Sequence, residues 1–241
     1  MRPVQKGTSP VATPPGFANY EDAKPDLISR LGPYCSYCER KIVTILHVEH
    51  LQPKGLPKYA HLELAWTNFL LACVNCNSTK LTKDVLFADL YFPDRDNTFA
   101  AFIYTPDGKV AGNISANPTI SAATLALTGF ANKRSVAIDT NGKEVAIDRG
   151  AQRMEAWLLA EESRNDFASN PSPELLRSTV RTAVACGHFS IWMTVFAGDG
   201  AVRNALIDAF PGTRASGCFD AQGNPVSPAP NPDRLADGGK V

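Results

Sequence analysis

The pattern of hydrophobic and polar residues predicts a mixed α+β fold, with a strand, a loop and a helix in the first third of the chain. Residues 41–51 (KIVTILHVEHL) are β-branched and apolar, which is typical of a strand. Two prolines and a glycine in residues 52–57 then predict a loop. Further on, apolar positions at helical spacing predict a helix that Ser78 or Thr79 caps and that runs through Leu90.

Four more helices are expected outside this region. A short helix should follow Pro25 and end at Gly32, because proline is favoured at the start of a helix and glycine just after its end. Residues 119–130 are rich in alanine and leucine, which favours a helix. Another helix is expected after residues 171–173, and a further one beyond Gly187. The C-terminal half should therefore be mostly helical.

Two segments carry hairpin signals. The segment FAAFIYTPDGKVAG predicts a β-hairpin that turns at residues 106–108. Residues 135–150 are ambiguous, because Asn141 and Gly142 could turn a second hairpin or could precede a helix that begins at Lys143 and runs on through residues 153–164. Of these two alternatives, we expect the helix.

Composition divides the chain into four parts. Residues 1–19 contain four prolines and predict an arm that either packs on the body or stays mobile. Residues 20–95 hold the predicted core, and residues 96–220 form an α-rich region with a hairpin that offers a surface for a partner. Residues 221–241 have four prolines and hardly any large apolar residue, so we expect disorder there.

Charge and hydropathy limit the classes of protein to consider. The chain has 241 residues and a formal net charge of zero, so it is not an electrostatic nucleic-acid binder as a whole. It has no apolar run of membrane-spanning length, and the first residues lack the apolar core of a secretory signal. We therefore expect a cytoplasmic protein with no membrane partner.

The cysteines predict a metal site. Four of the six form two Cys-x-x-Cys pairs, Cys35/Cys38 and Cys73/Cys76. A chain without an export signal uses such pairs as thiolate ligands rather than as disulfides. Two pairs supply the four soft ligands of a tetrahedral structural zinc. Zinc would then clamp the two ends of the segment between the pairs.

The segment between the pairs carries residues that a structural zinc site does not need. His50 can act as a general base, because imidazole titrates near neutral pH. Glu49 is a hard oxygen ligand suited to Mg²⁺ or Mn²⁺, and Asn77 can supply a second oxygen. Asn68 can hydrogen-bond backbone groups and hold the loop that carries His50. A base, a divalent ion and a fixed geometry are what phosphodiester hydrolysis requires.

Basic residues near these positions could bind nucleic acid. Lys54, Lys80 and Lys83 could hold phosphates on either side of a scissile bond. His47 would share a strand face with Glu49, where it could contact metal or phosphate or could serve as a structural histidine.

Together these residues resemble the zinc-bearing HNH endonucleases, also called His-Me finger nucleases. The resemblance is carried by Cys35-x-x-Cys38, Glu49-His50-x-x-Pro53, Asn68 and Cys73-x-x-Cys76-Asn77-x-x-Lys80. It implies a zinc-clamped ββα-metal core in an α+β chain, and a hydrolase that cuts DNA or, in some members, RNA. The motif's third letter is Asn here rather than His, and Glu replaces the commoner Asp before the base.

The resemblance also implies roles for individual residues. His50 would be the base that activates water, and Glu49 and Asn77 would bind the single catalytic Mg²⁺ or Mn²⁺. Asn68 would orient the hairpin, and the four cysteines would hold zinc. Non-catalytic alternatives remain, chiefly a zinc module that binds nucleic acid or protein and keeps the HNH frame as a scaffold.

A closer resemblance concerns the segments around the motif. GPYCSYCER, EHLQPKG and WTNFLLACVNCNSTK are similar to HNH nucleases of Septu- and retron-type bacterial anti-phage systems, which act beside a partner ATPase. This resemblance implies an effector nuclease of antiviral defence. A toxin-like effector with broad nuclease activity is a further alternative. Residues 35–83 have six Lys and Arg against three Glu, and a zinc tetrathiolate of about −2 would nearly cancel that excess. Unassisted DNA binding should therefore be weak.

Overall fold

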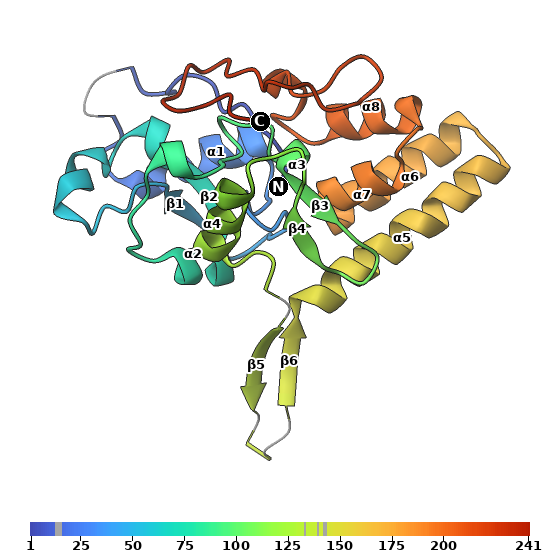
Figure 1. The fold of residues 1–241 in the computed structure, drawn as a ribbon, viewed down its shortest axis with the longest axis horizontal. Helices are drawn as coiled ribbons and strands as arrows, with labels where there is room; N and C mark the ends of the chain where they lie inside the picture. The colour runs from blue at the N-terminus through green and yellow to red at the C-terminus, as the bar shows by residue number, and fades with distance from the viewer. Residues whose placement is uncertain (13–15, 133, 139, 142–143) are drawn as a thin grey trace.

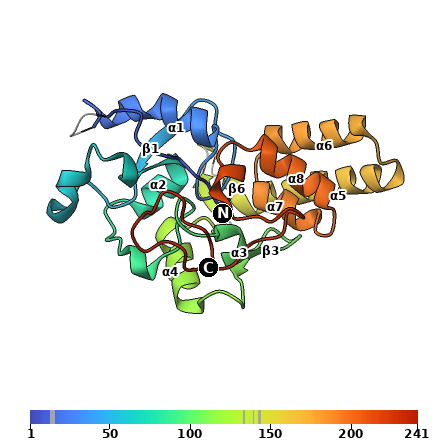
Figure 2. The same cartoon turned by 90° about the horizontal axis from the view of Figure 1, so that it is seen from above.

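A computed structural model describes residues 1–12, 16–132, 134–138, 140–141 and 144–241. Figure 1 shows a small two-stranded sheet with short helices at one end of the molecule and a group of longer helices at the other. Figure 2 shows these two parts side by side, with the N- and C-terminal segments running between them. The mixture of small sheets and helices confirms the predicted α+β class.

The elements of the first half surround the two-stranded sheet. They are α1 (Lys24–Leu31), β1 (Leu46–His50), β2 (Phe69–Cys73), α2 (Val74–Lys80), α3 (Thr98–Ala101), β3 (Phe102–Tyr104), β4 (Val110–Gly112) and α4 (Pro118–Thr128). Short 3₁₀ helices lie at Tyr20–Ala23, Pro57–Leu62, Trp66–Asn68 and Phe87–Asp89. The predicted helices near residues 26–32 and 119–130 are confirmed, as is the hairpin that turns at residues 106–108.

The second half is mostly helical, as predicted. Its elements are β5 (Arg134–Ile138), β6 (Glu144–Asp148), α5 (Arg149–Ser169), α6 (Pro173–Cys186), α7 (Phe189–Val195), α8 (Gly200–Ala209) and a 3₁₀ turn at Arg214–Ser216. The helices expected after residues 171–173 and beyond Gly187 are α6 and α7. Helix α8 was not foreseen; the side chain of Asp199 caps it by accepting a hydrogen bond from the Val202 amide. None of the described helices has the length and apolarity needed to cross a bilayer.

Strands β1 and β2 pair antiparallel and lead directly into α2. The register joins Leu46 to Cys73 at one end and His50 to Phe69 at the other. Because α2 begins at the residue after Cys73, the second cysteine pair lies at the strand–helix junction. This is a ββα unit in which the helix position is set by the end of the sheet.

The predicted bounds of that helix were wrong. The helix was expected from Ser78 or Thr79 through Leu90, but α2 starts at Val74 and ends at Lys80. It begins early because Cys73 has an extended backbone at the N-cap. It stops early because Leu81 takes a positive φ, so the apolar positions beyond it lie in turns and a 3₁₀ helix rather than on one helical face.

The predicted start of the next helix at Lys143 was also wrong, whereas its course through residues 153–164 is confirmed by α5, which begins at Arg149. Strands β5 and β6 pair antiparallel from Arg134 and Asp148 to Ile138 and Glu144, so this segment is the alternative hairpin. The predicted turn at Asn141-Gly142 includes Gly142, which lies outside the described residues. In Figure 1 this hairpin extends away from the body of the molecule.

The N-terminal arm packs on the body, which was one of the two alternatives for it. Met1, Arg2 and Val4 are buried, and the Gln5 amide donates to the carbonyl of Gly212. The C-terminal residues, for which composition predicts disorder, lie against the same region. The Gly239 amide donates to the Arg95 carbonyl, so backbone hydrogen bonds rather than large apolar side chains place this segment.

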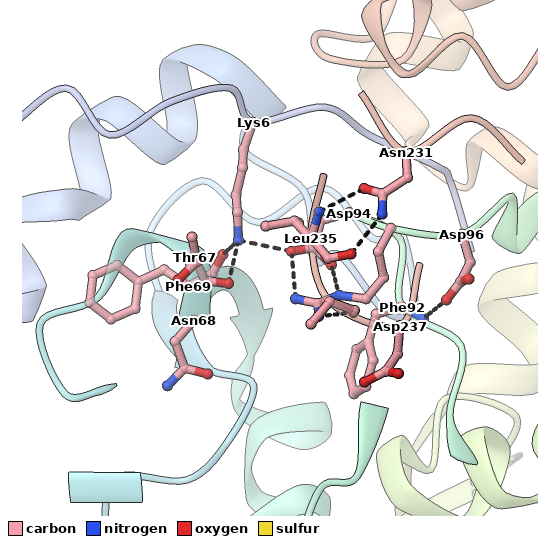
Figure 3. A network of polar contacts seen from close by, with 12 residues as sticks. Lys6, Thr67, Asn68, Phe69, Phe92, Asp94, Asp96, Asn231, Leu235 and Asp237 are labelled. Atoms are coloured by element: carbon pink, nitrogen blue, oxygen red, sulfur yellow. Dashed lines mark hydrogen bonds and ion pairs between the residues drawn. The ribbon is translucent and has the colours of Figure 1, made fainter. Parts of the chain in front are cut away.

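A buried polar network joins the arm to the sheet (Figure 3). The Lys6 ammonium donates to the carbonyls of Thr67 and Phe69 at 3.1 and 2.8 Å, and it contacts Asp94 Oδ2 at 2.8 Å. Burial lowers the pKa of Lys6, and the attraction of Asp94 opposes that effect. Arg95 also contacts Asp94 and donates to the Ala236 carbonyl. The network therefore connects the N-terminal arm, the start of β2 and the C-terminal segment.

Replacing Lys6 with Met should strongly destabilise the fold. Removing one partner of a buried ion pair typically costs about 3–5 kcal/mol, because the other charge stays buried. Urea unfolding followed by circular dichroism would measure this change. Lys24→Met is the matched control, because its partly exposed pair with Glu21 should contribute only about 0–1 kcal/mol. Equal losses in the two variants would contradict the assignment of Lys6 to a buried network.

Candidate active site and cysteine cluster

The four cysteines of the two Cys-x-x-Cys pairs meet in a buried cluster. All four sulfurs lie within 4.8 Å of one another, and the Sγ atoms of Cys38 and Cys73 are 3.7 Å apart. A tetrahedral zinc with Zn–S bonds of about 2.3 Å needs sulfurs about 3.8 Å apart. The donor set and its spacing therefore fit one zinc ion. Such an ion would fasten the loop before β1 to the junction of β2 and α2.

Arg40 supports this cluster and was not identified from the sequence. Its Nη2 atom lies 3.3 Å from Cys73 Sγ and donates to Asn75 Oδ1 at 3.0 Å, while Nη1 donates to Gln152 on α5. A guanidinium beside thiolates offsets part of their negative charge. Arg40 also connects the cluster to the helical half of the chain. Position just after a Cys-x-x-Cys pair was its only signal in the sequence.

Three of the four predicted catalytic residues, Glu49, His50 and Asn77, border a cavity of about 350 Å³ between β1, α2 and the loop after β1. Six of the predicted site residues line it: His47, Glu49, His50, Lys54, Asn77 and Lys80. Lys83 lines a different hollow, and its Nζ reaches the Ala126 carbonyl at 3.4 Å. The structure thus brings together most of the predicted site and leaves Asn68 and Lys83 outside the cavity.

His50 is held with one ring nitrogen directed at the backbone. Its Nε2 atom is 2.9 Å from the Glu63 carbonyl, and its ring contacts the rings of Tyr20 and Phe69 edge to face. A carbonyl can only accept, so Nε2 must carry the proton and Nδ1 is the basic nitrogen. No hydrogen bond to Nδ1 comes from the described part of the chain. Burial lowers the pKa of His50, which favours the neutral form that a base requires.

Glu49 forms a buried ion pair with Lys80. Its Oε1 atom is 2.9 Å from the Lys80 ammonium and accepts a hydrogen bond from the Tyr37 hydroxyl at 3.3 Å. Lys80 also donates to the His50 carbonyl at 2.7 Å. Burial raises the pKa of Glu49, and Lys80 opposes this shift. Lys80 therefore binds the two residues at the end of β1, a different position from the predicted contact with phosphate.

Asn68 hydrogen-bonds the loop after His50, as the sequence suggests. Its Oδ1 accepts from the Gln52 amide at 2.8 Å, and its Nδ2 donates to the Gln52 carbonyl at 2.9 Å. This two-way pairing fixes the backbone two residues after His50. Lys6 binds the carbonyls on both sides of Asn68, so the buried network of Figure 3 holds Asn68 in turn.

Lys54 lines the cavity from the loop after β1. Its ammonium is 2.7 Å from Glu63 Oε1 and 3.8 Å from the centre of the Tyr20 ring. Because Glu63 contacts Lys54 through its side chain and His50 through its carbonyl, it joins the two predicted site residues. Tyr20, Tyr37 and Glu63 were not identified from the sequence, since no motif marks them.

Comparison with known proteins supports the same region. Residues 35–83 match the family model of the HNH endonucleases. The match begins at the first cysteine of the cluster and contains every predicted site residue from His47 to Lys83. No curated protein matches the chain. Residues 35–83, referred to below as the HNH domain, supply most of the cavity lining, and Tyr20 and Glu21 supply the rest.

The cavity of the HNH domain offers oxygen ligands to a divalent ion. Glu49 and Asn77 both line it, and the Asn77 side chain accepts or donates no hydrogen bond among the described residues. Carboxylate and amide oxygens are ligands that Mg²⁺ and Mn²⁺ accept, usually together with several waters. The donor set therefore fits one hydrated divalent ion, provided that Glu49 shares its carboxylate with Lys80.

Replacing Cys38 with Ser should remove bound zinc and destabilise the HNH domain. Structural zinc contributes folding free energy directly, so its loss should lower the melting temperature by about 10 °C or more. Metal analysis by mass spectrometry and thermal unfolding would test this together. Cys186→Ser is the control, because Cys186 lies outside the cluster on α6 and should leave about one zinc per chain. Normal zinc content in Cys38→Ser would contradict the cluster as a zinc site.

Proposed function

We propose that this protein is a metal-dependent endonuclease that hydrolyses phosphodiester bonds of DNA. The observation that carries the proposal is the single cavity that His50, Glu49 and Asn77 line within the HNH domain. A base beside two oxygen ligands is the arrangement that metal-assisted phosphodiester hydrolysis needs.

His50 acts as the general base. Its Nε2 proton is committed to the Glu63 carbonyl, so Nδ1 takes a proton from a water molecule as that water attacks phosphorus. The new P–O bond forms as the bond to the leaving 3′-oxygen breaks. Asn68 keeps the loop after His50 in place, so the imidazole needs little reorganisation during the reaction.

Glu49 and Asn77 hold the divalent ion, Mg²⁺ or Mn²⁺. When bound, this ion stabilises the negative charge of the crowded phosphate and of the leaving 3′-oxygen. Lys80 keeps the Glu49 carboxylate directed along the cavity wall. Lys54 and His47, which line the same cavity, contact the neighbouring phosphates. Zinc in the cysteine cluster has no part in the reaction and fixes the start of α2, from which Asn77 projects.

A second candidate is a non-catalytic zinc module that binds nucleic acid. The Glu49–Lys80 ion pair favours it, because a carboxylate already neutralised by an ammonium binds a divalent ion less strongly. Metal-dependent cleavage distinguishes the two candidates, since the module would retain binding and zinc but would cut nothing.

The biological role follows from resemblance. We infer an effector nuclease of a bacterial anti-phage system that acts with a partner ATPase, with residues 20–95 as the nuclease core and residues 96–220 as the surface for the partner. The support for this role is the similarity of the segments around the motif to Septu- and retron-type nucleases. Co-purification of the protein with the product of the neighbouring gene, and stimulation of cleavage by that product, would test it.

His50→Ala should abolish cleavage without unfolding the protein. Loss of the base should lower the cleavage rate by about 10²–10⁴-fold. Conversion of supercoiled plasmid in Mg²⁺ or Mn²⁺, measured beside zinc content and melting temperature, would test this. The control is His61→Ala, because His61 is exposed on the 3₁₀ helix Pro57–Leu62 and outside the cavity. Cleavage at the wild-type rate by His50→Ala would contradict the assignment of the base.

Asn77→Ala should raise the concentration of Mg²⁺ needed for half-maximal cleavage. Losing even an outer-shell partner of a metal lowers affinity by about 10–100-fold, and a direct ligand should cost at least as much. The measurement is a Mg²⁺ titration of plasmid cleavage. Ser78→Ala, at the next and exposed position of α2, should leave the titration unchanged. An identical Mg²⁺ requirement in both variants would exclude Asn77 as a ligand.

A further inference from the structure

Part of the cavity lining comes from outside the region that matches the HNH family. Tyr20 and Glu21 border the cavity beside residues of β1 and α2, although the match begins only at Cys35. Glu21 is engaged locally, since its carboxylate pairs with the Lys24 ammonium. Tyr20 contacts two residues of the proposed active site. The family match therefore leaves the role of the Tyr20 ring unassigned.

The Tyr20 ring packs against the proposed base. Its centroid is 4.9 Å from that of the His50 imidazole, with 67° between the two planes, and Phe69 contacts the imidazole at 5.2 Å and 86°. Both separations fall within the range of about 4.5–7 Å that edge-to-face aromatic pairs prefer. The hydrogen bond from Nε2 to the Glu63 carbonyl fixes one atom of the imidazole, but the ring can still turn about that bond. Contact with two aromatic rings restricts this rotation.

The same tyrosine ring holds the cationic group of Lys54. The Lys54 ammonium lies 3.8 Å from the ring centroid, well inside the range of about 6 Å over which a cation–π interaction acts. The ammonium also pairs with the Glu63 carboxylate, but both of these side chains are partly exposed, so the ion pair alone contributes little. The face of the tyrosine ring therefore helps to keep the ammonium at the cavity instead of in solvent.

Local structure fixes the position of Tyr20. It is the first residue of the 3₁₀ helix Tyr20–Ala23, and the N-cap side chain of Asn19 accepts a hydrogen bond from the Glu21 amide at 3.0 Å. The chain continues directly into α1, which buries Leu27 and packs beside β2. The ring is thus carried by a segment that is capped at its start and anchored to the sheet at its end.

We propose that Tyr20 is a positioning residue that sets both the ring orientation of the base and the place of the phosphate-binding ammonium. This inference rests on the proposed function and adds to it a residue from outside the matched region. By restricting the His50 imidazole, Tyr20 keeps Nδ1 directed at the attacking water. By holding Lys54 Nζ on its face, it keeps a cation beside the phosphate that neighbours the scissile bond. One side chain thereby fixes the spacing between the base and a substrate contact.

The test uses variants of the full chain. Tyr20→Leu removes the ring and keeps an apolar side chain, whereas Tyr20→Phe retains the ring that makes both contacts. Lys54→Met removes the ammonium. Tyr59→Leu is the matched control, because the Lys58 ammonium lies over the Tyr59 ring at 4.9 Å but Tyr59 does not line the cavity. Cleavage of a short DNA duplex in Mg²⁺ gives kcat and KM, and the affinity for the duplex is measured without added metal ion.

The two contacts predict a specific pattern in these measurements. Tyr20→Leu should lower kcat about tenfold, because the base leaves its reactive orientation more often, and should raise KM and weaken duplex binding about threefold, because the ammonium is no longer held. Tyr20→Phe should stay within about twofold of wild type in all three quantities. In the Lys54→Met background, Tyr20→Leu should still lower kcat but should leave KM unchanged, since its effect on KM acts through the ammonium. Tyr59→Leu should cleave as wild type does.

Nuclear magnetic resonance tests the contact with the base independently of cleavage. The chain has four histidines, so His50→Ala identifies the ring signals of His50 in a ¹H–¹³C spectrum. Tyr20→Leu should shift these signals, because the ring current of Tyr20 is lost. Tyr20→Phe and Tyr59→Leu should leave them close to their wild-type positions.

Four outcomes would overturn the assignment of Tyr20. These are wild-type kcat and KM in Tyr20→Leu, an equal loss of activity in Tyr20→Phe, unshifted His50 signals in Tyr20→Leu, or a rise in KM that persists in the Lys54→Met background. The proposed hydrolysis fails separately. Absence of cleavage by wild type in Mg²⁺ and Mn²⁺ would refute the hydrolysis, and the His50 signals and the duplex affinities would then decide by themselves whether Tyr20 positions His50 and Lys54.

Discussion

The convergence of four cysteine sulfurs is the constraint on which the rest of the site depends. Cys73 and Cys76 must reach the sulfurs of Cys35 and Cys38, so the chain must turn from strand to helix at Cys73. Because α2 starts at Val74, the direction in which each of its side chains points about the helix axis is fixed. Asn77 therefore lies at the cavity and Lys80 reaches Glu49. The metal-binding geometry of one cluster thus determines the shape of a second, adjacent site.

The second site is stabilised by compensation of buried charge. Glu49 and Lys80 are both buried, and each would be costly without the other. Lys80 also bonds the His50 carbonyl, so the backbone of the proposed base and the Glu49 carboxylate are held by one side chain. Glu63 in turn contacts both His50 and Lys54. Two side chains, Lys80 and Glu63, therefore hold Glu49, His50 and Lys54 in place. These contacts position the site although little regular secondary structure surrounds it.

The sequence predicted the cluster and the cavity residues because their identity and spacing are set by chemistry. Cys35, Cys38, Cys73 and Cys76 are recognisable as ligands wherever the chain takes them. The bounds of α2 could not be predicted in the same way, since the apolar spacing beyond it imitates a helix that the conformation of Leu81 ends. Lys80 was predicted to contact phosphate, because a lysine in such a motif is expected at the surface. In the structure it is buried against Glu49, which the sequence does not indicate. The segment that forms β5 and β6 was predicted as the start of a helix, because a short segment can fit both the helix and the hairpin pattern.

The network around Lys6 has a consequence for the order in which the chain can fold. Asn68 is held by Lys6, which shares Asp94 with Arg95, and Arg95 bonds the carbonyl of Ala236 and the amide of Gly239. Translation delivers these last partners only after the rest of the described chain has emerged from the ribosome. The contacts that support Asn68 from this side are therefore completed only when residues near 236 and 239 have joined the folded body.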